Sequence, residues 1–167
     1  MPTSAAQSEA FAYRAHRMAP PVIVTAYNGI IIGHDATTGA RVFAHNIGQS
    51  GLVNAFGISA RVVVRAVELL VTETRIFAVA AQTVHCFEYP SGRPLGSAAL
   101  GPPVFSVRPV MLCVEDRLFV GLGARLFCLD PDGRVLWSAD VYHEPRETNS
   151  MSIAVPGAAR QQDVDGR

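Results

Sequence analysis

The sequence contains no lysine. All 14 basic residues are arginines, and 14 acidic residues balance them, so the formal net charge is zero. The arginines are scattered singly, whereas a protein that binds nucleic acid or an anionic membrane usually carries a basic patch. We therefore expect neither nucleic acid nor a membrane among the partners of this chain.

Cysteine is also scarce. Cys86, Cys113 and Cys128 form no CxxC pair, and no histidine lies at the spacing of a zinc site. An odd number of cysteines without a spacing pattern is typical of small, buried side chains in a reducing compartment. The sequence predicts free thiols and no metal centre.

Long hydrophobic runs are missing as well. The two longest charge-free stretches, 18–34 and 42–60, are interrupted by Pro, Asn, Gly, Gln and His, which a membrane-spanning helix would not contain at these intervals. Residues 1–21 carry Gln, Ser and Glu where a secretory signal has an apolar core. We expect a cytoplasmic protein.

What the chain does contain favours one packed domain. Of its 167 residues, 49% are hydrophobic and 17% are charged. A chain of this length buries roughly 70% of the surface of its unfolded state. We expect an N-terminal arm at 1–17, a β domain at 18–156 and a disordered tail at 157–167.

An internal repeat is the most informative feature. Residues 69–77, LLVTETRIF, match residues 111–119, MLCVEDRLF, with apolar on apolar at both ends and Glu-x-Arg matched in the middle. A third copy precedes both. Repeats of about 42 residues predict stacked supersecondary units. We expect three such units, or blades, at about 22–47, 67–100 and 109–140.

Each full copy divides into short strands joined by turns. In the last copy we expect strands at 109–115, 117–123, 125–130 and 134–140. In the first copy, Asn28-Gly29 is typical of a two-residue hairpin turn with positive φ. The next turn of every copy begins with an acidic residue and ends with glycine.

The strands are apolar on both sides. Gly33, Cys86 and Cys128 occupy equivalent positions on a face of small side chains, and the opposite face is mostly bulky. This pattern suits sheets that stack face to face about 10 Å apart, as propeller blades do. Equivalent cysteines on adjacent blades are poorly placed for a disulfide.

The turn and the strand after it resemble the PQQ-like, or quinoprotein-type, β-propeller repeat. The pattern D-x-x-T-G-x-x-x-[WF] runs from Asp35 to Phe43, and a variant of it runs from Asp130 to Trp137, while the middle copy has Gly96 at the aromatic position. The resemblance covers about residues 22–140. It implies an all-β partial β-propeller of about three antiparallel blades, completed in one alternative by oligomerisation, with Trp137 packed between blades.

No pattern predicts a catalytic site. The side chains of His34-Asp35, and those of His143-Glu144, point to opposite faces if they lie on a strand, which does not suit one metal ion. The GLGAR segment at 121–125 lacks the third glycine of a dinucleotide loop, and GQSG at 48–51 lacks the spacing of a nucleophile elbow. We name no catalytic, cofactor-binding or metal-binding residue, and we expect no cofactor.

Two segments stand outside the repeat. Residues 48–66 predict either an inserted hairpin or a long strand that runs into Leu70. Met151, Ile153 and Val155 lie on a strand-like segment that belongs to no blade. The first copy lacks its first strand, and this segment of a second chain could supply it, giving a six-bladed ring with two-fold symmetry. The alternative is an open stack whose apolar end faces need a partner.

These features favour a non-enzymatic interaction or scaffold module, an accessory subunit of a larger assembly. Its partner is another protein or a second copy of the chain, and Met151, Ile153 and Val155 are the candidate interaction residues. The alternative is a degenerate or split quinoprotein-like oxidoreductase.

Overall fold

Every regular element that the structure describes is a β-strand, which confirms the expected all-β fold. The structure is a computed structural model, and the residues it describes are 21–48, 50–55, 58–63, 67–101, 108–141, 152–156 and 158–161. The expected N-terminal arm, His143-Glu144 and Met151 lie outside these residues. In the described part of the chain no helix is long and apolar enough to span a membrane.

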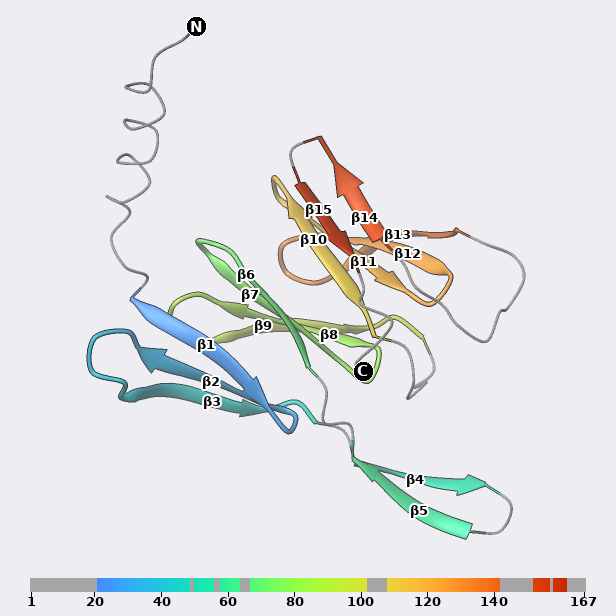
Figure 1. Ribbon diagram of the computed structural model, residues 1–167, viewed down its shortest axis with the longest axis horizontal. Helices are drawn as coiled ribbons and strands as arrows, with labels where there is room; N and C mark the ends of the chain where they lie inside the picture. Colours follow the sequence, from blue (N-terminus) through green and yellow to red (C-terminus); the bar gives the residue numbers. More distant parts are fainter. Residues whose placement is uncertain are drawn as a thin grey trace, which may run out of the picture.

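Three antiparallel sheets form the body of the molecule, and we call them blades 1, 2 and 3 (Figure 1). Blade 1 consists of β1 (Val22–Tyr27), β2 (Ile30–Asp35) and β3 (Arg41–Asn46); blade 2 of β6 (Glu68–Val71), β7 (Arg75–Ala80), β8 (Thr83–Glu88) and β9 (Pro94–Ala99); and blade 3 of β10 (Val110–Val114), β11 (Arg117–Leu122), β12 (Arg125–Leu129) and β13 (Val135–Asp140). The expected strands of blade 3 are confirmed to within one residue. The described part of blade 1 has no counterpart of β6 and β10, and residues 16–20, where the repeat would place that strand, lie outside the described residues.

Two further hairpins lie outside the blades. β4 (Ser50–Ala55) pairs with β5 (Ile58–Val63), so the hairpin is the correct one of the two structures considered for residues 48–66. In Figure 1 it extends away from the blades. β14 (Ser152–Val155) pairs with β15 (Ala158–Gln161).

The strand β15 corrects the expectation of a disordered tail from residue 157, at least for residues 158–161. Val155 pairs with Ala158, and only Pro156 and Gly157 separate them.

Turn chemistry follows the predicted pattern where one strand of a blade meets the next. Asn28 and Gly29 both have positive φ, 50° and 78°. Ala81 and Gln82 occupy the same turn in blade 2 with φ of 48° and 65°, although neither residue favours that conformation. In blade 1 the turn residues themselves favour the hairpin conformation, whereas in blade 2 strand pairing holds Ala81 and Gln82 in a conformation that they do not favour.

The acidic turns begin with Asp35, Glu88 and Asp130. Asp35 Oδ1 accepts hydrogen bonds from the backbone N–H groups of Thr37 at 3.0 Å and Thr38 at 2.7 Å, which hold the pKa of its carboxyl below the ordinary value. Asp130 Oδ1 accepts from two backbone N–H groups in the same way.

Glu88 uses its carboxylate differently. It accepts hydrogen bonds from the guanidinium of Arg93 and the hydroxyl of Ser91, and its pKa falls to about 2, chiefly through Arg93. The expectation that the acidic residue accepts hydrogen bonds from backbone N–H groups is thus confirmed for the two aspartates. The longer Glu88 side chain binds the side chains of Ser91 and Arg93 instead.

Blade 2 lies between blades 1 and 3, and an apolar core fills each junction (Figure 1). The core between blades 1 and 2 includes Ile31, Ile76, Ala78 and Phe87. The core between blades 2 and 3 includes Phe77, Val79, Val84, Leu118, Val120 and Leu129. The molecule is therefore a stack of sheets whose successive faces bury one another.

Candidate functional site

Three equivalent positions on the outer strands of the blades differ most between copies. Phe43 pairs with Gly33, Gly96 with Cys86, and Trp137 with Cys128, so Phe43, Gly96 and Trp137 occupy the same place in the repeat. Phe43 and Gly96 lie on the face that their blade turns toward the next blade, and Trp137 lies on the corresponding face of blade 3. We call this the forward face, and the opposite one the backward face.

At the first junction, Phe43 packs against the turn of the next blade. A Cβ atom added at Gly92 would collide with the Phe43 ring, so the turn of blade 2 can approach blade 1 only because residue 92 is glycine. Gly92 also has φ of 72°, a conformation that glycine adopts freely. Phe43 and Gly92 therefore form a close contact of a ring on a glycine turn.

Polar contacts reinforce the first junction. His45 Nε2 lies 2.7 Å from the carbonyl oxygen of Gly92, which accepts its hydrogen bond. The His45 ring stacks on Phe87 with centroids 4.8 Å apart. The hydroxyl of Tyr89 donates to the carbonyl oxygen of Val22 at 2.9 Å. The contacts between blades 1 and 2 thus extend from the outer strand to the start of β1.

The second junction is built without an aromatic ring. A Cβ atom at Gly96 would lie 2.7 Å from the carbonyl oxygen of Asp132, and one at Gly133 would lie 2.5 Å from Cys86 Sγ. The turn of blade 3 therefore packs backbone against blade 2. Arg75 Nε donates to the carbonyl oxygen of Pro131 at 3.3 Å, and Arg75 Nη2 pairs with Asp132 Oδ1 at 3.4 Å.

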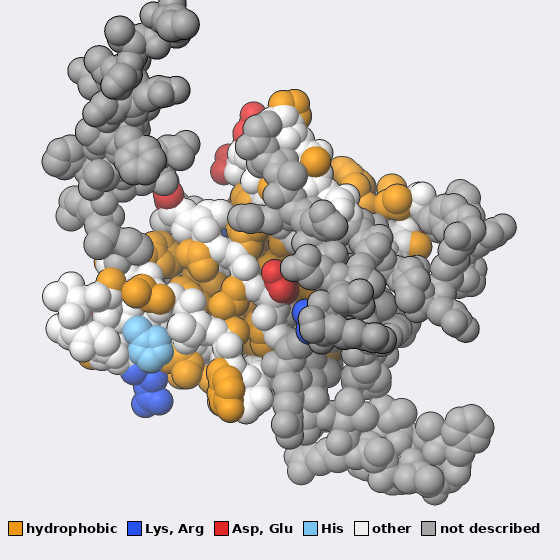
Figure 2. All heavy atoms as spheres, in the orientation of Figure 1, with side chains coloured by type: hydrophobic (Ala, Val, Ile, Leu, Met, Phe, Trp, Pro, Cys, Tyr) orange, Lys and Arg blue, Asp and Glu red, His pale blue; other side chains and the backbone are white. Residues whose placement is uncertain are grey.

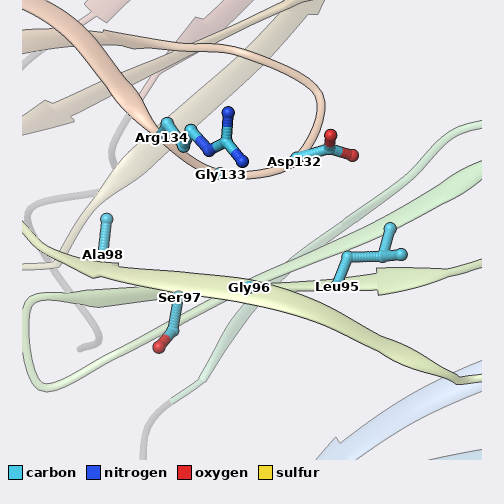
Figure 3. A pocket seen from close by; sticks show the side chains of 7 residues that line it. All are labelled: Leu95, Gly96, Ser97, Ala98, Asp132, Gly133 and Arg134. Atoms are coloured by element: carbon cyan, nitrogen blue, oxygen red, sulfur yellow. The ribbon is translucent and has the colours of Figure 1, made fainter.

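A groove of about 410 Å³ opens at the second junction, where the other copies carry an aromatic side chain. Its lining residues are Leu95, Gly96, Ser97, Ala98, Asp132, Gly133 and Arg134. Figure 3 shows the Leu95 and Ala98 side chains directed toward the turn of blade 3, and the Ser97 side chain directed away from it. The charged side chains in the lining are Asp132 and Arg134, so the groove carries one negative and one positive charge.

The thiol next to this groove is a poor nucleophile. Burial, together with the nearby carboxylates of Asp130 and Asp132, raises the pKa of Cys86 to about 12. The thiolate is the reactive form of cysteine, and little of it is present near neutral pH. The three cysteines are free, as predicted.

A second hollow, of about 310 Å³, lies between the turns of blades 2 and 3. It brings together Glu73, Glu115 and Asp116, which the repeat places in equivalent turns. Among the described residues, no group of three His, Cys, Asp or Glu side chains is arranged to hold a metal ion.

The described histidines take part in local contacts. His34 Nδ1 lies 3.3 Å from the carbonyl oxygen of Gly39. His85 Nε2 is buried without a hydrogen-bond partner, and burial lowers the pKa of His85. The neighbouring Asp35 side chain binds other backbone groups of the same turn, the N–H groups of Thr37 and Thr38.

The backward face of blade 1 is apolar and exposed. Tyr27 is 73% exposed and Ile23 51%, while Ile76 and Ala78, on the backward face of blade 2, are fully buried. Ile30 and Val42 of blade 1 are exposed as well. Figure 2 shows hydrophobic side chains reaching the surface of the blades in this view, with few charged side chains among them.

The forward face of blade 3 ends in an exposed outer strand. All six residues of β13 are exposed, and Trp137 is 45% exposed, with its ring 6.1 Å from that of Phe119. Within a single copy, therefore, the expectation that Trp137 packs between blades is wrong. Phe43 is covered because blade 2 follows it, whereas no blade follows Trp137 among the described residues.

The candidate interaction residues lie near blade 3. Ile153 and Val155 are half-buried on β14, and β14 and β15 both lie beside β10 (Figure 1). Their role in binding stays a prediction. The turn glycines of the blade junctions were missed as contact residues, although their recurrence in all three copies was a signal that could have revealed them.

No family model and no curated protein matches this sequence. A europium-containing methanol dehydrogenase matches its structure with a TM-score of 0.50 and 16% identity, over 71% of this chain and 22% of that chain. The chain is a partial β-propeller. The WD40 domain of Neurospora crassa Pan2 gives a TM-score of 0.48 and 13% identity, over 83% of this chain and 41% of that chain. This β-propeller thus spans less than half of either structure.

Proposed function

We propose that this chain is a non-enzymatic β-propeller module of PQQ-like repeats that binds protein, acting in the cytoplasm as a scaffold or accessory subunit of a larger assembly. The observation that supports this most is the exposed apolar backward face of blade 1. Contiguous apolar surface in a soluble protein is a mark of interaction sites. Equivalent side chains in blade 2 are buried by a neighbouring blade, so the corresponding surface of blade 1 is suited to contact with another protein surface.

The test is photo-crosslinking from this face in living cells. Benzoylphenylalanine at position 27 should form a discrete adduct with a protein that mass spectrometry identifies. The control carries the same group at Ser97, an exposed position on the outer strand of the middle blade. Equal, diffuse labelling from both positions, or no adduct from position 27, would contradict the proposal.

A second candidate is a degenerate or split quinoprotein-like oxidoreductase, which the likeness to a methanol dehydrogenase favours. The enzymes that the repeat resembles use a quinone and a metal ion. The described residues do not fit that group, since they provide no set of three metal-ligating side chains. Substrate-dependent dye reduction after addition of PQQ and Ca²⁺ would replace the first proposal with this one.

A further inference from the structure

Both halves of a blade junction are exposed at opposite ends of this chain. Within the chain, the ring of Phe43 on the outer strand of blade 1 packs on the Gly92 turn of blade 2. The equivalent ring on blade 3 is Trp137, and the equivalent turn on blade 1 ends at Gly39. Neither has a partner of this kind in the described residues.

The Gly39 turn already has the conformation that such a contact needs. Gly39 and Gly92 both have φ of 72°. The N–H of Gly39 donates to the carbonyl oxygen of Asp35 at 2.8 Å, and the N–H of Gly92 donates to that of Glu88 at 2.8 Å. A Cβ atom at Gly92 would meet the Phe43 ring, whereas one at Gly39 would meet no atom within 4 Å. The turn of blade 1 thus has the backbone conformation of the Gly92 turn, and the space next to Gly39 is free for a ring.

Trp137 is the side chain of blade 3 that corresponds to Phe43 of blade 1. It pairs with Cys128 on the neighbouring strand, as Phe43 pairs with Gly33, so both rings stand at the same register position of a forward face. Val135 and Leu136 beside it are exposed too. We propose that Trp137 of one copy seats on the Gly39 turn of a second copy, so that blade 3 of one stacks on blade 1 of the other.

The first strands of blades 2 and 3, β6 and β10, which we call inner strands, form a series that β14 continues. β6, β10 and β14 begin at Glu68, Val110 and Ser152, at equal intervals of 42 residues. β1 lies beside β6, β6 beside β10, and β10 beside β14 and β15. The hairpin therefore continues the series of inner strands past blade 3, and blade 1 has no such inner strand among the described residues. In the pair of copies, Ile153 and Val155 of one lie next to β1 of the other.

Stacking in this way covers the apolar ends of both copies. The backward face of blade 1, with Ile23 and Tyr27, meets the forward face of blade 3, and burial of such surface drives association. Two junctions related by a two-fold axis close a ring of six blades, within the usual range of four to eight. This inference rests on the proposed function and names the partner as a second copy.

The first experiment measures the mass of the full chain by sedimentation across a range of concentrations. Trp137→Ser should raise the dimer dissociation constant about 30-fold or more, as truncation of a central interface aromatic does. Trp137→Phe is the control, because Phe43 makes the same contact within the chain, and it should stay within a few-fold of the wild type. A wild-type chain that is monomeric at tens of micromolar, or a dimer that Trp137→Ser leaves intact, would overturn the inference.

The second experiment locates the contact. Benzoylphenylalanine at position 137 in one isotopically labelled copy should crosslink to the peptide containing residues 35–40 of an unlabelled copy. A crosslink to any other region of the chain would contradict the proposed junction. If the chain stays monomeric while position 27 captures a different protein, self-association fails and the interaction module stands; if position 27 captures a second copy, both are supported.

Discussion

The two blade junctions use one position of the repeat in opposite ways. At the first, Phe43 projects from the outer strand and packs on a glycine turn. At the second, Gly96 leaves that place empty, and the backbone of Asp132 approaches instead. An aromatic residue is therefore one of two ways to join blades, and the glycine of the following turn is common to both.

Trp137, the third residue at this repeat position, shows that the local sequence pattern alone does not determine burial. Trp137 has the strand and register that Phe43 has, after a turn one residue shorter, yet it is 45% exposed. What Trp137 lacks in the described chain is a following blade. Burial at this position depends on the next sheet and also on the cross-strand neighbour, because the Phe43 ring lies over Gly33, where blade 3 has Cys128.

The largest effect should come from removing the ring at the first junction. Phe43→Ala should lower the free energy of unfolding by about 3 kcal/mol, because a large side chain between two sheets leaves a cavity. Trp137→Ala is the matched control, and in dilute solution it should cost less than about 0.5 kcal/mol. Urea unfolding of both variants at a concentration that favours single chains measures the difference. Equal losses would show that the two rings are equally buried.

A smaller difference should separate the glycines that end the equivalent turns of blades 1 and 3. Gly39→Ala should cost about 1 kcal/mol, through backbone strain at positive φ alone. Gly133→Ala has that strain and a collision with Cys86, which adds roughly 1–3 kcal/mol. The extra loss at Gly133 should shrink in a Cys86→Ala background, where the sulfur is absent. If the loss stays unchanged there, the contact with Cys86 does not limit the second junction.

The hairpin turns of blades 1 and 2 offer the smallest comparison. Ala81 has φ of 48° where blade 1 has Asn28 with φ of 50°. Ala81→Gly should raise the free energy of unfolding by about 0.5–1 kcal/mol, because glycine adopts this conformation without strain. Asn28→Ala should lower it by a similar amount. Thermal unfolding compares the two, and a loss of stability in Ala81→Gly would contradict the strain assigned to this turn.

The features that could be predicted from the sequence are those encoded in a few consecutive residues. The strands of blade 3 follow from apolar runs between turns, and Asn28-Gly29 specifies its hairpin through positive φ. Each of these depends on neighbours in the chain.

The features that could not be predicted depend on contacts between sheets. The repeat marked Gly96 as an exception, but only the structure places the Asp132 backbone against it. The exposure of Trp137 depends on which sheet follows. The strand β15 has a weak apolar pattern and owes its place to pairing with β14.

The fluorescence of Trp137 tests most directly whether the end of blade 3 is a docking surface for a second copy. It is the single tryptophan of the chain, so its emission reports on one position. As the concentration rises from nanomolar to tens of micromolar, the emission should move to shorter wavelength, in step with the increase in mass, because the half-exposed ring becomes buried on the Gly39 turn. An emission maximum that stays at the value of a solvated ring while the mass doubles would contradict this account.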